Sequence, residues 1–196
     1  MNYQRAHFVS APNDIMVTYL TAENGKMNFY AGIELNNNNL SGTITYHEAT
    51  HSQMISGSVN DNGLKFYSEM RIYTDGQTQY DTSRRQYHIT NASKVMIAMG
   101  AETNYLNDYP TYRDVNKDLV KEVQAKLNNL SLNSYTSLKE AHLDDYQSLF
   151  HRVELDLNSY EDIPTDELVK RYRNKFDSPY LEVLTLSTNI NIYQQK

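Results

Sequence analysis

Short stretches of alternating apolar and polar residues fill the first hundred positions of the chain, and turn-forming residues separate them. Alternation with a period of two is typical of strands that bury one face. The pattern predicts strands at residues 3–10, 15–20, 27–35, 42–48, 53–59, 64–74, 87–90 and 95–99. Short strands at this regular spacing indicate an antiparallel sandwich or barrel.

Asparagine, glycine and proline mark the positions where the chain reverses direction. Ala11–Asp14, Asn60–Gly63 and Thr74–Gln77 are predicted turns, and Asn36–Asn39 is a predicted polar loop. Asn24-Gly25 is a strong hairpin signal, because both residue types tolerate positive φ. It predicts that the strands on either side of it pair with each other.

The longest predicted strand, residues 64–74, alternates along its whole length. Its side chains divide into two sets, with Leu64, Phe66, Ser68, Met70 and Ile72 on one side and Lys65, Tyr67, Glu69, Arg71 and Tyr73 on the other. The first set is mainly apolar and the second carries the charges. We therefore expect one buried face and one face open to water.

From about residue 114 the apolar residues recur every three or four positions, which is the period of an amphipathic helix. The first helix is predicted over residues 116–130, with Asn116 as its N-cap. A second helix is predicted over residues 135–152. A third is expected to open at Thr165.

The stretch from Leu138 to Leu157 combines both periods, since a helical pattern gives way to alternation at about residue 153. His142 and Asp145 stand one turn apart on this helix, a spacing that can present two metal ligands. No third ligand is evident nearby. The favoured interpretation is structural: His142 is a buried polar residue, hydrogen-bonded to Asp145 or to the backbone, that locks the helix against the sandwich.

The same stretch reads His-x-x-Asp-Tyr-x-x-Leu-Phe-x-Arg-Val-x-Leu-x-Leu from His142 to Leu157, followed by Pro-Thr-Asp-Glu at residues 164–167. This motif resembles the linker of the α-L-fucosidase glycoside hydrolases whose type activity is on α-1,2-linked fucose. Segments 3–12, 62–67 and 102–105 also resemble that family, in the same order. The linker motif residues are His142, Asp145, Tyr146, Phe150 and Arg152.

In that family the linker joins an N-terminal β-sandwich to a catalytic (α/α)6 barrel. The resemblance implies a mainly β fold with C-terminal helices: an antiparallel, super-sandwich-like domain over residues 1–112, incomplete relative to the family, and a helical linker region over 113–196 with a short strand near 153–157. The family's acid and its water-activating groups lie in the barrel, and none of those motifs occurs here. The resemblance therefore assigns no catalytic residue to this chain.

Composition excludes several other functions. The net charge of -6, from 24 acidic and 18 basic residues, argues against nucleic acid as a partner. Without cysteine the chain has no disulfide, thiolate metal site or thiol nucleophile. With 7 glycines it has no phosphate-binding loop, and no Gly-x-Ser-x-Gly motif is present. No cofactor is expected. No apolar run reaches membrane-spanning length and the N-terminus lacks a signal peptide, which predicts a cytoplasmic protein if Met1 is the natural start.

Three functional hypotheses remain open. The leading one is a non-catalytic sandwich and linker that supports a catalytic barrel. The 17 tyrosines are compatible with a free-standing carbohydrate-binding module, although tyrosine in sheets also serves simple packing. The third is a homo-oligomer that associates through exposed sandwich edges.

Overall fold

The computed structural model describes residues 2–152, 164, 166–167 and 169–170. The chain forms two compact units, Met1–Asp145 and Tyr146–Lys196. The strands belong to the first unit: β1 (Asn2–Ser10), β2 (Ile15–Glu23), β3 (Met27–Ala31), β4 (Leu40–His47), β5 (Ser52–Val59), β6 (Lys65–Thr74), β7 (Gln77–Asp81), β8 (Gln86–Ala92) and β9 (Lys94–Thr103). The helices are α1 (Leu119–Leu127) and α2 (Tyr135–Phe150), with short 3₁₀ turns at Glu48–Thr50 and Leu132–Ser134.

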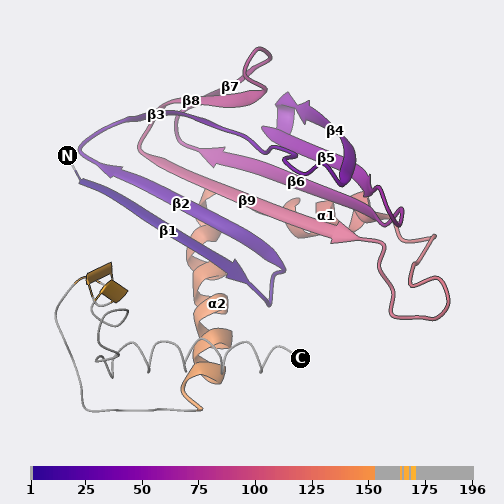
Figure 1. Ribbon diagram of the computed structural model, residues 1–196. Helices are drawn as coiled ribbons and strands as arrows, with labels where there is room; N and C mark the ends of the chain where they lie inside the picture. The colour runs from indigo at the N-terminus through magenta and orange to yellow at the C-terminus, as the bar shows by residue number, and fades with distance from the viewer. Residues whose placement is uncertain (1, 153–163, 165, 168, 171–196) are drawn as a thin grey trace. The chain divides into compact units, whose positions relative to one another are not determined.

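The strands form two antiparallel sheets that face each other (Figure 1). The larger has six strands in the order β1-β2-β9-β6-β5-β4, and the smaller has three in the order β3-β8-β7. The chain crosses between the sheets after β2, β3, β6 and β8. The predicted class, an antiparallel sandwich followed by helical structure, is confirmed.

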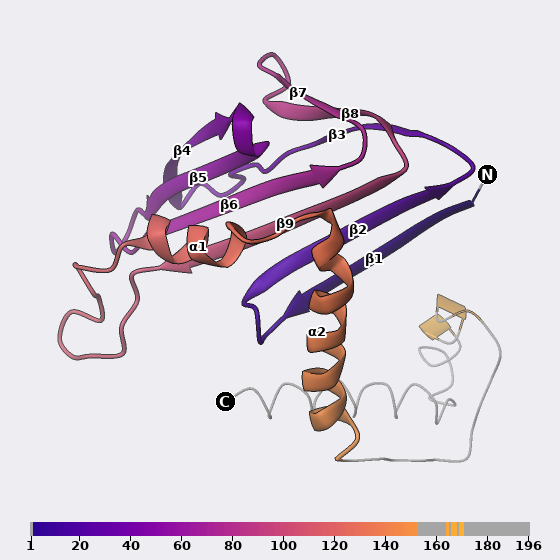
Figure 2. The same ribbon diagram turned by 180° about the vertical axis from the view of Figure 1, so that it is seen from behind.

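The six-stranded sheet is the middle of three layers, because it buries apolar side chains on both faces. Toward the small sheet it contributes to a cluster of Met70, Ile72, Tyr87, Ile89, Ala92 and Val95. Its opposite face packs against the helices through Ile15, Val17, Tyr67, Met96, Ala98, Val123, Leu127 and Leu138. Figure 2 shows α1 lying across β6 and β9 on this helix-bearing face.

The hairpin predicted at Asn24-Gly25 is wrong. Asn24 does adopt the left-handed conformation, with φ of 56°. However, β2 pairs with β1 and β9, whereas β3 pairs with β8 in the other sheet. The turn is therefore a crossover between sheets. A local φ preference specifies a reversal of the chain, but tertiary packing decides which strands become neighbours.

One strand is shorter than predicted, and one strand forms where none was predicted. The strand predicted over residues 27–35 ends at Ala31, where β3 loses its pairing with β8. No strand was predicted at Gln77–Asp81, yet β7 forms there and pairs with β8. Thr78 and Tyr80, residue types that favour strands, are half-buried in the small sheet.

The first helix is shorter than predicted and has a different cap. Asp118, not Asn116, is the N-cap of α1, and its carboxylate accepts a 3.1 Å hydrogen bond from the Lys121 amide. Asn116 instead donates its amide to the Asp114 side chain in the preceding turn. Both residue types are good N-caps, so sequence alone did not separate them.

The second predicted helix is confirmed as α2. The extended segment predicted at 153–157 and the start of a third helix at Thr165 lie outside the described residues, although Asp166, Glu167, Val169 and Lys170 are helical. Among the described residues, we find no helix with the length and apolarity needed to cross a bilayer.

Candidate functional site

The middle of the charged face of β6, predicted to be open to water, is buried, whereas Lys65 at the start of the strand is exposed as predicted. Glu69 is 1% exposed, and Tyr67 and Arg71 are also buried. The prediction failed because α1 packs over this face of the sheet and excludes water from it. An alternating pattern cannot reveal that a helix far along the chain covers the polar side of a strand.

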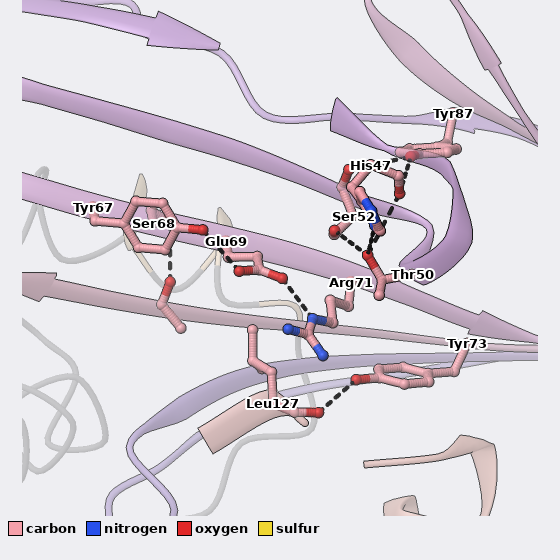
Figure 3. A network of polar contacts seen from close by, with 11 residues as sticks. His47, Thr50, Ser52, Tyr67, Ser68, Glu69, Arg71, Tyr73, Tyr87 and Leu127 are labelled. Atoms are coloured by element: carbon pink, nitrogen blue, oxygen red, sulfur yellow. Dashed lines mark hydrogen bonds and ion pairs between the residues drawn. The ribbon is translucent and has the colours of Figure 1, made fainter. Parts of the chain in front are cut away.

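Glu69 lies between two partners on its own strand (Figure 3). The Tyr67 hydroxyl donates to Oε2 of Glu69 over 2.8 Å, and Nε of Arg71 donates to Oε1 over 2.6 Å. Residues two apart on a strand lie on the same face, which explains why the three side chains meet. The network satisfies a buried carboxylate and a buried guanidinium together, as burial of charge requires.

Two tyrosine hydroxyls on this face are held in their neutral form. Burial raises the pKa of Tyr67, and the hydrogen bond to Glu69 raises it further. Burial also raises the pKa of Tyr73, against the opposing effect of the Arg71 charge. The Tyr73 hydroxyl donates to the Leu127 carbonyl over 3.0 Å and so anchors the end of α1 to the sheet. These groups stabilise the helix rather than exchange protons.

A second polar cluster lies at the 3₁₀ turn that follows β4 (Figure 3). The Tyr87 hydroxyl lies 3.0 Å from the His47 carbonyl oxygen and 3.1 Å from that of Ser52. Burial raises the pKa of Tyr87 to about 12. The cluster joins the small sheet to the large one.

An ion-pair network holds α1 from its outer side. Glu102 at the end of β9 pairs with Lys117 at 2.6 Å and with Lys126, which also pairs with Asp14. Burial acts to raise the pKa of Glu102, but the hydrogen bonds and charges of Lys117 and Lys126 outweigh it, so the pKa is lowered. The carboxylate is therefore ionised and paired at neutral pH.

The predicted linker residues lie along α2 and just beyond it. His142 is half-buried, and its ring stacks on Phe8 of β1 with centroids 5.0 Å apart and an interplanar angle of 22°. Asp145 is half-buried, the rings of Tyr146 and Phe150 stack at 5.3 Å, and Nε of Arg152 donates to the Ser148 carbonyl over 3.1 Å. The Phe8 contact agrees with a packing role for His142, which stays a prediction.

Among the described residues, no group of three histidine, cysteine, aspartate or glutamate side chains comes together as metal ligands. The first turn of α2 makes a further aromatic contact, because the rings of Tyr135 and Tyr19 stack with centroids 3.8 Å apart. Aromatic stacking thus joins both β1 and β2 to α2.

A second candidate site, which was not predicted from the sequence, lies at the loop between β9 and α1. This loop projects beyond the ends of the strands (Figures 1 and 2). A hollow of about 480 Å³ lies beside it. The signal available in the sequence was the run of tyrosines at 105, 109 and 112 in a polar segment. Residues lining the hollow include Asn62, Leu64, Tyr105, Thr111, Tyr112 and Arg113.

The matches to known families cover two separate segments of the chain. Residues 1–108, more than half of the chain, match the family described as glycosyl hydrolase family 65, N-terminal domain. Residues 134–188 match the family described as glycosyl hydrolase family 95 catalytic domain. The buried networks on β6 and β8 lie inside the first of these two segments.

Curated relatives of this chain include two proteins named as fucosidases. The chain is 32% identical over 98 residues to probable alpha-fucosidase A of Aspergillus niger, a match covering 46% of this chain and 12% of that protein. It is 26% identical over 131 residues to alpha-L-fucosidase 2 of Arabidopsis thaliana, covering 62% of this chain and 15% of that protein. The chain thus spans a small part of the length of both relatives.

Proposed function

Because this chain belongs to the family of glycosyl hydrolase family 65 N-terminal domains, we propose that it is a non-catalytic sandwich and linker of an α-L-fucosidase-like glycoside hydrolase. Its role would be to support and orient a catalytic barrel. The two fucosidase relatives and the match of residues 134–188 to a family 95 catalytic domain support this proposal.

The single observation that carries the proposal is the state of Glu69. Glycoside hydrolysis requires two carboxyl groups that reach the substrate on opposite sides of the scissile bond. Glu69 is the fully buried acid among the described residues, and it is committed to Tyr67 and Arg71 beneath α1. A carboxylate so enclosed is a packed structural group and does not meet a sugar.

The helix-bearing face gives the supporting role a physical basis. Buried hydrogen bonds, ion pairs and stacked rings fix α1 and the start of α2 on the six-stranded sheet. A fixed helix at the end of a sandwich can set the direction in which the following domain begins. The linker motif residues His142 and Asp145 would then act by packing and not by catalysis.

A chimera tests this role. The chain would replace the matched segment of the Arabidopsis relative, and hydrolysis of an aryl α-L-fucoside would be measured beside thermal stability. We expect the chimera to hydrolyse the substrate, and we expect the same chimera with Glu69→Gln to keep its kcat while melting at a lower temperature. Loss of kcat in a Glu69→Gln chimera of unchanged stability would contradict a structural role for Glu69.

Self-association is the second candidate, and the edge of the six-stranded sheet favours it. No described strand pairs with the outer edge of β1. Val9 on β1 is 64% exposed and its cross-strand neighbour Met16 is 43% exposed. An unpaired edge beside apolar side chains is a template for association. Sedimentation velocity should then show a dimer that Val9→Lys returns to monomer, whereas a monomer at all concentrations would exclude this candidate.

A further inference from the structure

The loop that follows β9 exposes three tyrosines, two of which line the hollow described above. Tyr105 is 54% exposed and Tyr112 is 44% exposed, and both line the hollow. Tyr109 is 81% exposed and its ring meets that of Tyr112 edge to face, with centroids 6.3 Å apart. Two exposed rings that line one hollow, with a third ring against one of them, form a candidate binding surface, because grouped exposed apolar side chains often mark interaction sites.

Hydrogen bonds at its base close the loop. Asn104 is buried, and its side chain accepts a 2.8 Å hydrogen bond from the Lys65 amide. The Asp114 amide donates to the Asn104 carbonyl over 2.9 Å and closes the loop on itself. The Leu106 amide donates to the Tyr112 carbonyl over 3.2 Å. The two tyrosines that line the hollow are therefore presented by an ordered support.

Tyr112 has a backbone conformation that aromatic residues seldom adopt. Its φ is 52°, in the left-handed region that glycine and asparagine adopt with the least strain. Non-glycine residues held in this region cluster at ligand clamps and active sites. The strain points to a use for the Tyr112 ring at this position.

The lining of the hollow combines flat apolar faces with neutral hydrogen-bonding groups. Tyrosine rings supply faces and hydroxyls, Thr111 a further hydroxyl, and Asn62 an amide. Arg113 lines the same hollow, and its guanidinium donates to the Asn62 carbonyl. No acidic residue is among the lining residues of this hollow, so its lining offers no carboxylate to a cation.

We propose that this hollow binds a neutral pyranose ring of a glycan, stacked on Tyr105 and Tyr112, with its hydroxyls hydrogen-bonded to Asn62, Thr111 and Arg113. A sugar ring offers a C–H face bordered by hydroxyls, which matches this lining. The volume lies in the range of about 300–1,000 Å³ usual for small-molecule sites. The choice of a glycan rests on the proposed function, since it takes the ligand class from a glycoside hydrolase.

Other ligand classes fit the hollow less well. A polyanion such as nucleic acid would meet one guanidinium on a chain of net charge -6, which repels it. A proline-rich peptide also binds aromatic grooves, but it gains little from the amide and hydroxyls that share this hollow. A peptide of this kind serves as the competing probe in the test.

The test is a titration of the chain, labelled with ¹³C in its tyrosine rings, with the fucosylated trisaccharide 2′-fucosyllactose and with decaproline. The ring signals of Tyr105 and Tyr112 should shift and saturate with the trisaccharide alone. Tyr105→Ala and Tyr112→Asn should each weaken binding by about tenfold or more. Asparagine suits the positive φ at 112, so that variant removes the ring without adding backbone strain.

Matched variants keep the result interpretable. Tyr3→Ala removes an exposed tyrosine from β1 and should leave the affinity unchanged. Tyr105→Phe keeps the ring and should bind within about threefold of the parent chain. No saturable shift, shifts confined to other tyrosines, or a preference for decaproline would each overturn the proposal. Failure of the glycan titration would leave the proposed supporting role of the chain unaffected. Hydrolysis of a fucoside by the chain would contradict the supporting role but not glycan binding in the hollow.

Discussion

At the scale of single residues, the most deeply buried charges of the described structure form an ion pair that α1 covers. Glu69 and Arg71 lie two residues apart on β6 and neutralise each other, and the Tyr67 hydroxyl donates a hydrogen bond to Glu69. Such a pair stabilises a fold weakly as a whole, because desolvation offsets most of the attraction. Removing one partner is costly, because the other charge stays buried alone.

This asymmetry predicts a specific order of stabilities. Glu69→Gln leaves the Arg71 charge unpaired and should lower the free energy of unfolding by about 3–5 kcal/mol. Replacing both, as Glu69→Leu with Arg71→Met, should lose less than the single substitution. Urea unfolding followed by circular dichroism would measure both. A double variant less stable than Glu69→Gln would contradict the description of the pair.

The buried Tyr87 hydroxyl predicts a dependence on alkaline pH. Its pKa rises from 10.0 to about 12 on folding, so the folded state holds the proton more tightly than the unfolded state. The stabilisation is complete below pH 10 and is lost as the pH rises through 12. The loss should be on the order of 2 kcal/mol.

Two tyrosine variants isolate that effect. Tyr87→Phe has no proton to lose at this site and should show a flatter decline in unfolding free energy between pH 10 and pH 12. Tyr109→Phe alters a ring that is 81% exposed and should decline as steeply as the parent chain. Equal slopes for Tyr87→Phe and the parent would show that another group controls the alkaline limb.

At the scale of elements, α1 is the helix that turns the middle sheet into a buried layer. It covers β6 and β9, its end accepts the Tyr73 hydroxyl, and its outer side pairs with Glu102 through Lys126. Gly100 on β9 helps the helix approach, since an added Cβ would lie 3.2 Å from Val123 Cγ1. These contacts come from three different parts of the sequence.

The Glu102 network predicts how α1 responds to acid. The pKa of the Glu102 carboxyl is lowered from 4.5 in the folded state. The stabilisation by its ion pairs is therefore present above pH 4.5 and is lost as the pH falls below 4.5. Glu102→Gln should cost about 1 kcal/mol at pH 7, and this difference should shrink as the pH falls below 4.5. Glu122→Gln, on the exposed side of the same helix, is the control and should change stability by less than half as much. A pH-independent difference for Glu102→Gln would refute the ionic role.

The element scale also shows what a pattern of residues can and cannot predict. Strands 3–10, 53–59 and 64–74 were recognisable because alternation and turn residues are local signals. The partner of β2 was not, since the turn at Asn24 crosses between sheets instead of closing a hairpin. The buried state of Glu69 was equally hidden, because it depends on α1, a helix that begins fifty residues later at Leu119.

At the scale of the whole molecule, the motif on α2 and the family matches lead to the same interpretation. Phe8 stacks on His142, and residues 1–108 match a glycosyl hydrolase N-terminal domain. As with the fold, local sequence patterns were predictive for the sites and tertiary contacts were not. The His142 motif could be recognised in the sequence, whereas the Tyr105–Tyr112 hollow depends on how a loop folds back on Asn104.

The most direct test of the central claim is the rate at which the purified chain releases nitrophenol from 4-nitrophenyl α-L-fucoside. A non-catalytic sandwich and linker predicts a rate equal to that of buffer, at every pH and with or without added metal ions. Turnover that follows the chain through unfolding, repurification and refolding would contradict the claim, because it would require a catalytic carboxyl pair within these 196 residues.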